Sequence, residues 1–154
     1  EMTHLWQVLH IVAVVIWIGG MVFAHLCLRP AALALLQPPQ RLPLMSAALG
    51  HFFTLVSASL LLLWASGLAL FMQLASVGGR PPLSWNMMAA IAAVMTAVFL
   101  IVALRLHPRM RAALAANELP KAAAALDGIR RLVVLNLALG VLTIAVATLG
   151  RLLN

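Results

Sequence analysis

The chain has 154 residues, of which 65% are hydrophobic and only 8% are charged, with a formal net charge of +7. Soluble domains carry charge on roughly a quarter of their residues, so this composition excludes an ordinary soluble protein. The length allows one compact unit, and the uneven placement of the basic residues indicates membrane topology rather than nucleic-acid binding.

Four long stretches contain no Asp, Glu, Lys or Arg, namely residues 2–28, 42–79, 81–104 and 132–150. Each holds about 20 residues or more, the length that an α-helix needs to cross roughly 30 Å of hydrocarbon. Backbone N–H and C=O groups in lipid must be satisfied inside the segment, and four strands could not close a barrel. We therefore predict an all-α, polytopic membrane protein that forms one antiparallel four-transmembrane-helix bundle over residues 1–154.

The spans are predicted at about 4–29, 46–75, 84–106 and 130–152. The first span has no basic n-region and is too long for the core of a cleaved signal peptide. Residues 30–45 hold four prolines and are predicted to leave the membrane, with the helix broken at Pro38-Pro39. Residues 76–84 read as a tight turn. The polar stretch 105–131 is predicted to break near 117–120, where Asn117 caps a helix and Pro120 begins the next.

Basic residues gather on one side of the predicted bundle. The side on which the first span begins has Arg80 and Arg151, and the opposite side has Arg29, Arg41, Arg105, Arg109, Arg111, Lys121, Arg130 and Arg131. Excess Lys and Arg mark the cytoplasmic face of a membrane protein. This distribution predicts a multi-pass protein of the bacterial inner membrane, with periplasmic N- and C-termini and cytoplasmic basic loops.

Polar side chains inside lipid cost free energy unless they have a partner or a function, so they are the candidate site residues. In the first span, one line of the helix carries His10, Trp17 and Met21. His25 lies about 60° from His10 and roughly 22 Å further along the axis. The second span has a polar stripe of His51, Ser59, Ser66 and Gln73. The fourth span has a stripe that predicts close packing, in the bundle or in a homo-oligomer: Asn136, Gly140, Thr143, Ala147 and Gly150.

Threading the spans up and down places these groups at two levels. The periplasmic level holds His10 with Asn86, Met87 and Met88, at the start of the third span. The cytoplasmic level holds His25 and His51, the best candidates to share one ligand. Imidazole binds copper, zinc and haem iron, and thioethers bind Cu(I) and haem. Because the spans have no Asp or Glu, hard cations such as Mg²⁺ and Ca²⁺ are disfavoured.

Three segments resemble small members of the CopD-like copper-resistance family of bacterial inner membranes: "LHIVAVVIWIGG" at 9–20, "FAHLCLRPA" at 23–31 and "IRRLVVLNLALG" at 129–140. The four-span layout matches over nearly the whole chain. The same His…Trp…Gly pattern is similar to the haem-binding HemJ protoporphyrinogen oxidases, in which a histidine at the place of His10 ligates haem b. Many relatives carry a histidine where this chain has Asn86, and HemJ proteins use a lysine that these spans lack.

The first hypothesis is a copper-binding or copper-transporting membrane protein, with metal ligands among His10, His25, His51, Met21, Met87 and Met88. The resemblance adds a periplasmic copper-binding protein as partner, beside the lipid bilayer. The alternative is a haem b protein for membrane redox chemistry, with Trp17 and Asn86 near the cofactor. The third is a structural subunit whose histidines only join helices. The spans show no catalytic pair or phosphate loop, so any enzymatic activity would be that of a haem-dependent oxidoreductase.

Overall fold

A computed structural model describes residues 1–152 of the protein. The side chain of Arg151, which was counted among the basic residues of the N-terminal side, lies outside the described part. Helix accounts for 92% of the structure, and the described residues form no strand. Four helical stretches are long and apolar enough to span a membrane. The predicted all-α fold with four spans is confirmed.

Each passage is one helical stretch. The first consists of α1 (Met2–Phe23), a π-helical segment (Ala24–Leu28) and α2 (Arg29–Leu35). The second is α3 (Pro38–Ser76). The third consists of α4 (Leu83–Ile101), a second π-helical segment (Val102–Leu106) and α5 (His107–Ala115). The fourth is α6 (Leu119–Leu149), which continues into a 3₁₀ turn (Gly150–Leu152).

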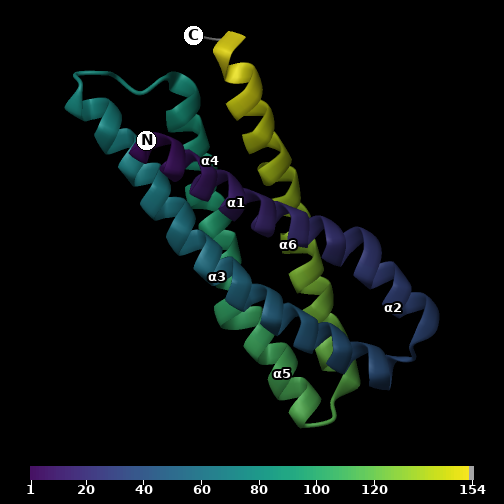
Figure 1. Ribbon diagram of the computed structural model, residues 1–154. Helices are drawn as coiled ribbons and strands as arrows, with labels where there is room; N and C mark the ends of the chain where they lie inside the picture. Colours follow the sequence, from purple (N-terminus) through teal and green to yellow (C-terminus); the bar gives the residue numbers. More distant parts are fainter. Residues whose placement is uncertain (153–154) are drawn as a thin grey trace.

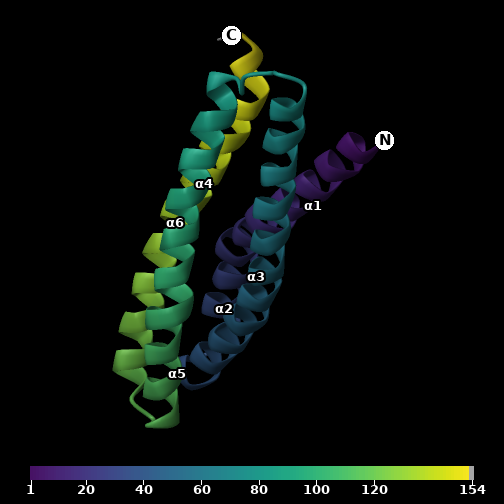
Figure 2. The ribbon, with the colours of Figure 1, turned by 90° about the vertical axis from the view of Figure 1, so that its left-hand side faces the viewer.

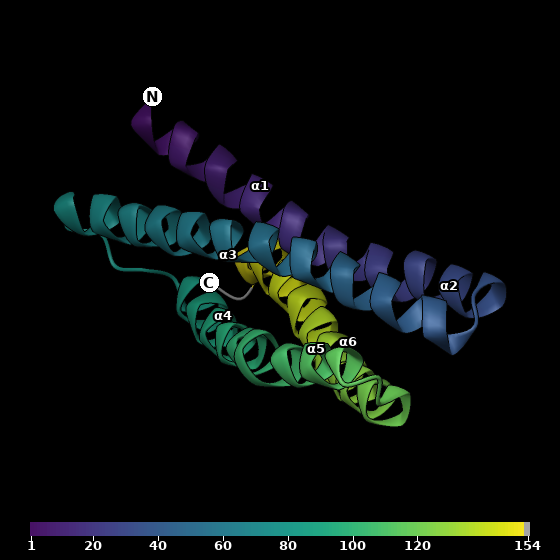
Figure 3. The same ribbon diagram turned by 90° about the horizontal axis from the view of Figure 1, so that it is seen from below.

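The helices are arranged as two antiparallel pairs. α1 packs along α3, and α4 with α5 packs along α6 (Figure 3). Figure 2 shows the first turns of α1 diverging from α4 and α6. The N-terminus and the α3–α4 turn lie at one end of the bundle, and the α2–α3 and α5–α6 turns lie at the other (Figure 1). We call these the N-terminal end and the basic end.

Aromatic rings and one glycine join the two pairs in the middle of the bundle. Trp17 of α1 meets Phe99 of α4 edge-on at 6.4 Å between ring centroids, and Phe99 meets Phe53 of α3 at 5.7 Å. Such edge-to-face pairs add about 0.5–1.5 kcal/mol each beyond the area they bury. At Gly140 of α6, a Cβ atom would lie 3.0 Å from the Ile18 side chain, so glycine allows α6 to approach α1 closely without a shift of that side chain.

The two π-helical segments have a local cause in the sequence. Each one ends directly before an X-Pro pair, Arg29-Pro30 or His107-Pro108. The N–H groups of Arg29 and His107 bond to carbonyls five residues back, at Ala24 and Val102. A proline has no N–H and its ring crowds the carbonyl four residues before it. A single widened turn accommodates the ring without breaking the helix.

Two turns close with the same C-cap geometry. Gly78, at φ 74°, and Asn117, at φ 55°, occupy the left-handed position after α3 and α5. The N–H groups of Gly79 and Glu118 then bond to carbonyls inside the preceding helix, at Leu74 and Ala113 (3.0 and 2.8 Å). This is the Schellman motif. Asn117 therefore ends α5, whereas Pro120 lies in the first turn of α6 as predicted.

The second helix begins earlier than predicted. Only Leu36 and Gln37 interrupt the helical path, and α3 starts at Pro38 instead of near residue 46. Pro38 and Pro39 occupy the first two helical positions, where the missing N–H groups would have no helical partner. The proline pair therefore opens a helix here as well as breaking one, and Pro43 is accommodated inside it at the loss of one backbone hydrogen bond.

His107 fastens α5 to the start of α3. Its side chain is 6% exposed, its Nε2 donates to the Ser46 carbonyl at 3.0 Å, and its ring lies edge-on to Phe53 at 5.2 Å. The Nε2–H of this imidazole is used in a bond between two helices, so His107 has a structural role.

We predict that His107→Ala lowers the free energy of unfolding by about 1–3 kcal/mol, because the Ser46 carbonyl loses its buried partner and the Phe53 ring loses a contact. Thermal melting followed by circular dichroism in detergent measures this change. His51→Ala is the matched control, since His51 is exposed and has no hydrogen bond among residues 1–152. Equal melting temperatures for the two variants would contradict this role of His107.

Candidate functional site

The structure separates His25 from His51. His25 is half-buried and lines a cavity at the basic end, and His51 is not among the residues that line it. His51 is exposed, because it lies two residues, or about 200°, from both Leu49 and Phe53, which are buried on the core side of α3. The structure thus does not place His51 at the cavity that His25 lines, and the sharing of one ligand by the two histidines stays a prediction.

His10 is the span histidine that a hydrogen-bond network orients. Its Nδ1 lies 3.0 Å from the Oγ of Ser66, and that hydroxyl in turn donates to the Leu63 carbonyl at 3.0 Å. A hydroxyl has one hydrogen, so when Ser66 gives it to the Leu63 carbonyl it accepts from an Nδ1–H of His10. This network favours the Nδ1–H tautomer of the imidazole, in which Nε2 keeps its lone pair.

The polar stripe of α3 provides this network. Ser66 is completely buried, and Gln73, two turns further on, accepts a hydrogen bond from Thr3 of α1 at 2.9 Å. The His10 ring lies beside Gly67, where a Cβ would be at an ordinary contact distance of 3.5 Å from His10 Cε1. The stripe thus aligns the outer turns of α1 on α3 and sets the direction of the imidazole.

The other predicted site residues are distributed differently. Trp17 and Met21 are buried in the bundle core, at 4% and 2% exposure. Met21 is 11 residues from His10, about 16 Å along the helix axis, so the two cannot share one ion. On α4, Asn86 and Met87 are exposed, and Met88 is half-buried.

Clustered ligands of the usual protein kind are absent from the described chain. Within residues 1–152, no group of three or more His, Cys, Asp or Glu side chains is placed to hold a metal ion. A metal at His10 would therefore take its remaining ligands from thioethers, from a porphyrin or from a partner. Thioether and imidazole together form a soft ligand set, suited to Cu(I) or haem iron.

The structure contains two polar contacts between helices that the sequence did not predict. One is the hydrogen bond between His10 and Ser66, although Ser66 belongs to the predicted polar stripe. Asn136 was predicted only as part of a packing face, and its Nδ2 donates to the Met95 carbonyl at 3.0 Å. Its Oδ1 is buried without a hydrogen-bond partner among residues 1–152. The packing face itself is confirmed at Gly140 and Gly150, which are buried, but Ala147 is exposed.

No family model, curated protein or solved structure matches this chain. A function for this chain is therefore inferred from the contacts of its own residues.

We predict that His10 is a neutral imidazole protonated at Nδ1, because Ser66 uses its only proton on the Leu63 carbonyl. The ¹⁵N chemical shifts of selectively labelled histidine, assigned with His10→Gln, report the tautomer directly. Ser66→Ala removes the acceptor and should shift His10 toward the Nε2–H form or a mixture of tautomers. An Nε2–H tautomer in the unaltered protein would contradict the network.

Proposed function

We propose that this chain is a metal-handling protein of the bacterial inner membrane that binds copper through His10. The observation that carries the proposal is the orientation of that imidazole by Ser66. Histidines that bind metals donate their second ring N–H to an oxygen acceptor, which fixes the tautomer and raises the basicity of the ligating nitrogen. His10 has this arrangement within an apolar span.

The ligands available at the N-terminal end suit copper better than Mg²⁺ or Ca²⁺, because those cations need six or more oxygen ligands. Cu(I) accepts imidazole and thioether, and the start of α4 carries Met87 and Met88, both at this end of the bundle (Figure 1). In this proposal, a movement of the outer turns of α1 toward α4 brings a thioether to the Nε2 of His10. The half-buried His25 is the candidate for a second, separate site at the basic end.

Haem b is the second candidate, and one observation favours it. A porphyrin supplies four nitrogens to its iron, so a single oriented protein nitrogen is enough to begin a haem site. His10 offers such a nitrogen without a cluster of further ligands. The protein would then serve membrane electron transfer.

The orientation in the membrane is proposed from charge. The α2–α3 and α5–α6 turns flank most of the basic residues, and these segments would face the cytoplasm by the positive-inside rule. His10 would then lie near the periplasmic surface, where a periplasmic copper-binding protein could deliver or receive an ion.

We predict that His10→Ala removes one bound equivalent of Cu(I), measured by competition against a chromophoric Cu(I) chelator in detergent. Ser66→Ala keeps the imidazole but loses its orientation, and should weaken binding by about 10–100-fold, as is typical when the hydrogen-bond partner of a metal-binding histidine is removed. His51→Ala is the control, because it deletes an exposed span imidazole and should leave the stoichiometry unchanged.

The absorption spectrum of the same purified protein separates copper from haem. A Soret band that shifts on reduction and disappears in His10→Ala would show that His10 binds haem b rather than copper. A colourless protein whose Cu(I) stoichiometry is the same with and without His10 would overturn the proposal, and His10 would then only fasten α1 to α3.

A further inference from the structure

A cavity of about 160 Å³ opens at the basic end, between the end of the first passage, the start of α3 and α6. Its polar lining consists of His25, Arg29, Arg41, Asp127 and Arg130. Its apolar lining includes Leu42, Met45 and Ile129, which belong to the bundle core. The cavity is thus lined by charged and polar side chains on one side and by apolar side chains of the bundle core on the other.

The arginines of the cavity share one membrane level. Arg29 is the first charge after the apolar stretch 2–28, and Arg41 is the last charge before the stretch 42–79. Arg130 directly precedes Arg131, the last charge before the stretch 132–150. Since each apolar stretch crosses the hydrocarbon, its terminal charge lies where the hydrocarbon meets the headgroups. Three helices therefore place guanidinium groups around one cavity at headgroup depth.

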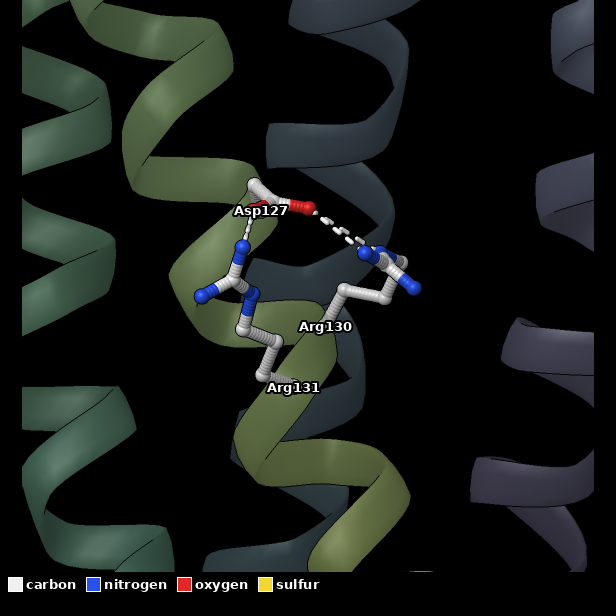
Figure 4. Close-up of polar contacts among 3 residues, drawn as sticks. All are labelled: Asp127, Arg130 and Arg131. Carbon is white, nitrogen blue, oxygen red and sulfur yellow. Dashed lines mark hydrogen bonds and ion pairs between the residues drawn. The ribbon is translucent and has the colours of Figure 1, made fainter.

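The one acidic group of the cavity is already neutralised. Asp127 Oδ1 accepts from Arg130 Nε and Nη2, at 3.2 and 2.7 Å, and Oδ2 pairs with Arg131 Nη2 at 3.0 Å. Figure 4 shows the two arginines reaching the carboxylate from opposite sides. Both carboxylate oxygens are used by guanidinium groups, and the three residues together keep one positive charge.

Within residues 1–152, Arg29 and Arg41 have no acidic partner. The sequence contains three acids in all, and besides Asp127 these are Glu1, at the N-terminal end, and Glu118, which pairs with Lys121 at 2.7 Å. Arg41 donates from Nη1 to the Leu36 carbonyl at 3.3 Å, which leaves its charge uncompensated. Two half-buried guanidinium groups at a low-dielectric boundary are stabilised by an anion that they can share.

We infer that this cavity binds the phosphate of an anionic phospholipid from the adjacent leaflet. Guanidinium groups donate paired hydrogen bonds that match phosphate oxygens, and basic pockets between transmembrane helices on the cytoplasmic side bind phospholipid headgroups. The apolar lining beside the arginines accepts the start of the acyl region, which a free phosphate ion would leave unfilled. The inference does not depend on the His10 copper site, because it uses none of the residues around His10, and its test alters arginines and Asp127 but leaves His25 in place.

The test uses the full chain in a non-ionic detergent, with phosphatidylglycerol, phosphatidylcholine or inorganic phosphate added at equal concentrations. A ligand that binds the native state raises the melting temperature, so circular dichroism melts give an apparent affinity for each probe. We expect phosphatidylglycerol to stabilise the protein more than phosphatidylcholine, and inorganic phosphate to have little effect. Arg29→Gln with Arg41→Gln should weaken the response to phosphatidylglycerol by about tenfold or more, as loss of two charge-assisted contacts implies.

The matched control is Arg105→Gln with Arg111→Gln, which removes the same charge from exposed positions that do not line the cavity. Its response to phosphatidylglycerol should equal that of the unaltered protein. Asp127→Asn tests the site in the other direction, because it frees Arg130 from its ion pair and should strengthen the response to phosphatidylglycerol. This variant keeps the test valid if the double variant at Arg29 and Arg41 folds poorly.

Three results would each overturn the inference. The first is an equal loss in the control variant, which would indicate diffuse surface charge. The second is an equal response to phosphatidylcholine and phosphatidylglycerol. The third is full stabilisation by inorganic phosphate alone, which would make the cavity a site for free anions.

Discussion

Lipid offers no hydrogen bonds, so a polar side chain inside a span is stabilised when it finds a partner within the protein. The interhelical contacts of this bundle follow from that constraint. Its polar side-chain contacts between passages are His10 with Ser66, Ser46 with His107, Met95 with Asn136, Trp64 with Thr96, and Thr3 with Gln73. Each joins one helix to one neighbour, so the same bonds that satisfy polar atoms also determine which helices pack together.

The two best-connected histidines show how this constraint separates structure from chemistry. His107 is buried and gives its Nε2 proton to a backbone carbonyl, so its role is complete within the fold. His10 is bonded at Nδ1 by the Ser66 hydroxyl, which also lies within hydrogen-bonding distance of the Leu63 carbonyl, and this network favours the tautomer in which Nε2 keeps its lone pair. The difference lies in which ring nitrogen is bound and how deeply the ring is buried.

At the basic end, positively charged side chains outnumber the acidic groups that could pair with them. Apolar spans push the charged residues to their ends, and only three of those residues are acidic. Asp127 pairs with its own neighbours on α6, but no acidic group in the described part of the chain pairs with Arg29 or Arg41. Membrane proteins have an external source of anions that soluble proteins lack, because anionic headgroups lie at this depth.

Much of the fold was predictable because its strongest signals are local. Hydropathy and the gaps between charges predicted the four spans, and the buried position of Trp17 agreed with its depth in the first span. The start of α3 was predicted wrongly, because a proline pair can end a helix or open one and composition does not distinguish the two. The break near 117–120 was predicted correctly, because Asn117 and Pro120 carry local signals for the end of one helix and the start of the next.

The sequence by itself determined that the chain is helical, that it crosses lipid four times, and that its cations gather at one end. These properties depend on how each segment partitions between water and hydrocarbon, which needs no knowledge of its neighbours. Only the tertiary structure decided that His51 faces outward, that Ser66 orients His10, and that three arginines from three passages surround one cavity. Those properties depend on the rotation of each helix about its axis, and that rotation is set by packing between helices rather than by hydropathy.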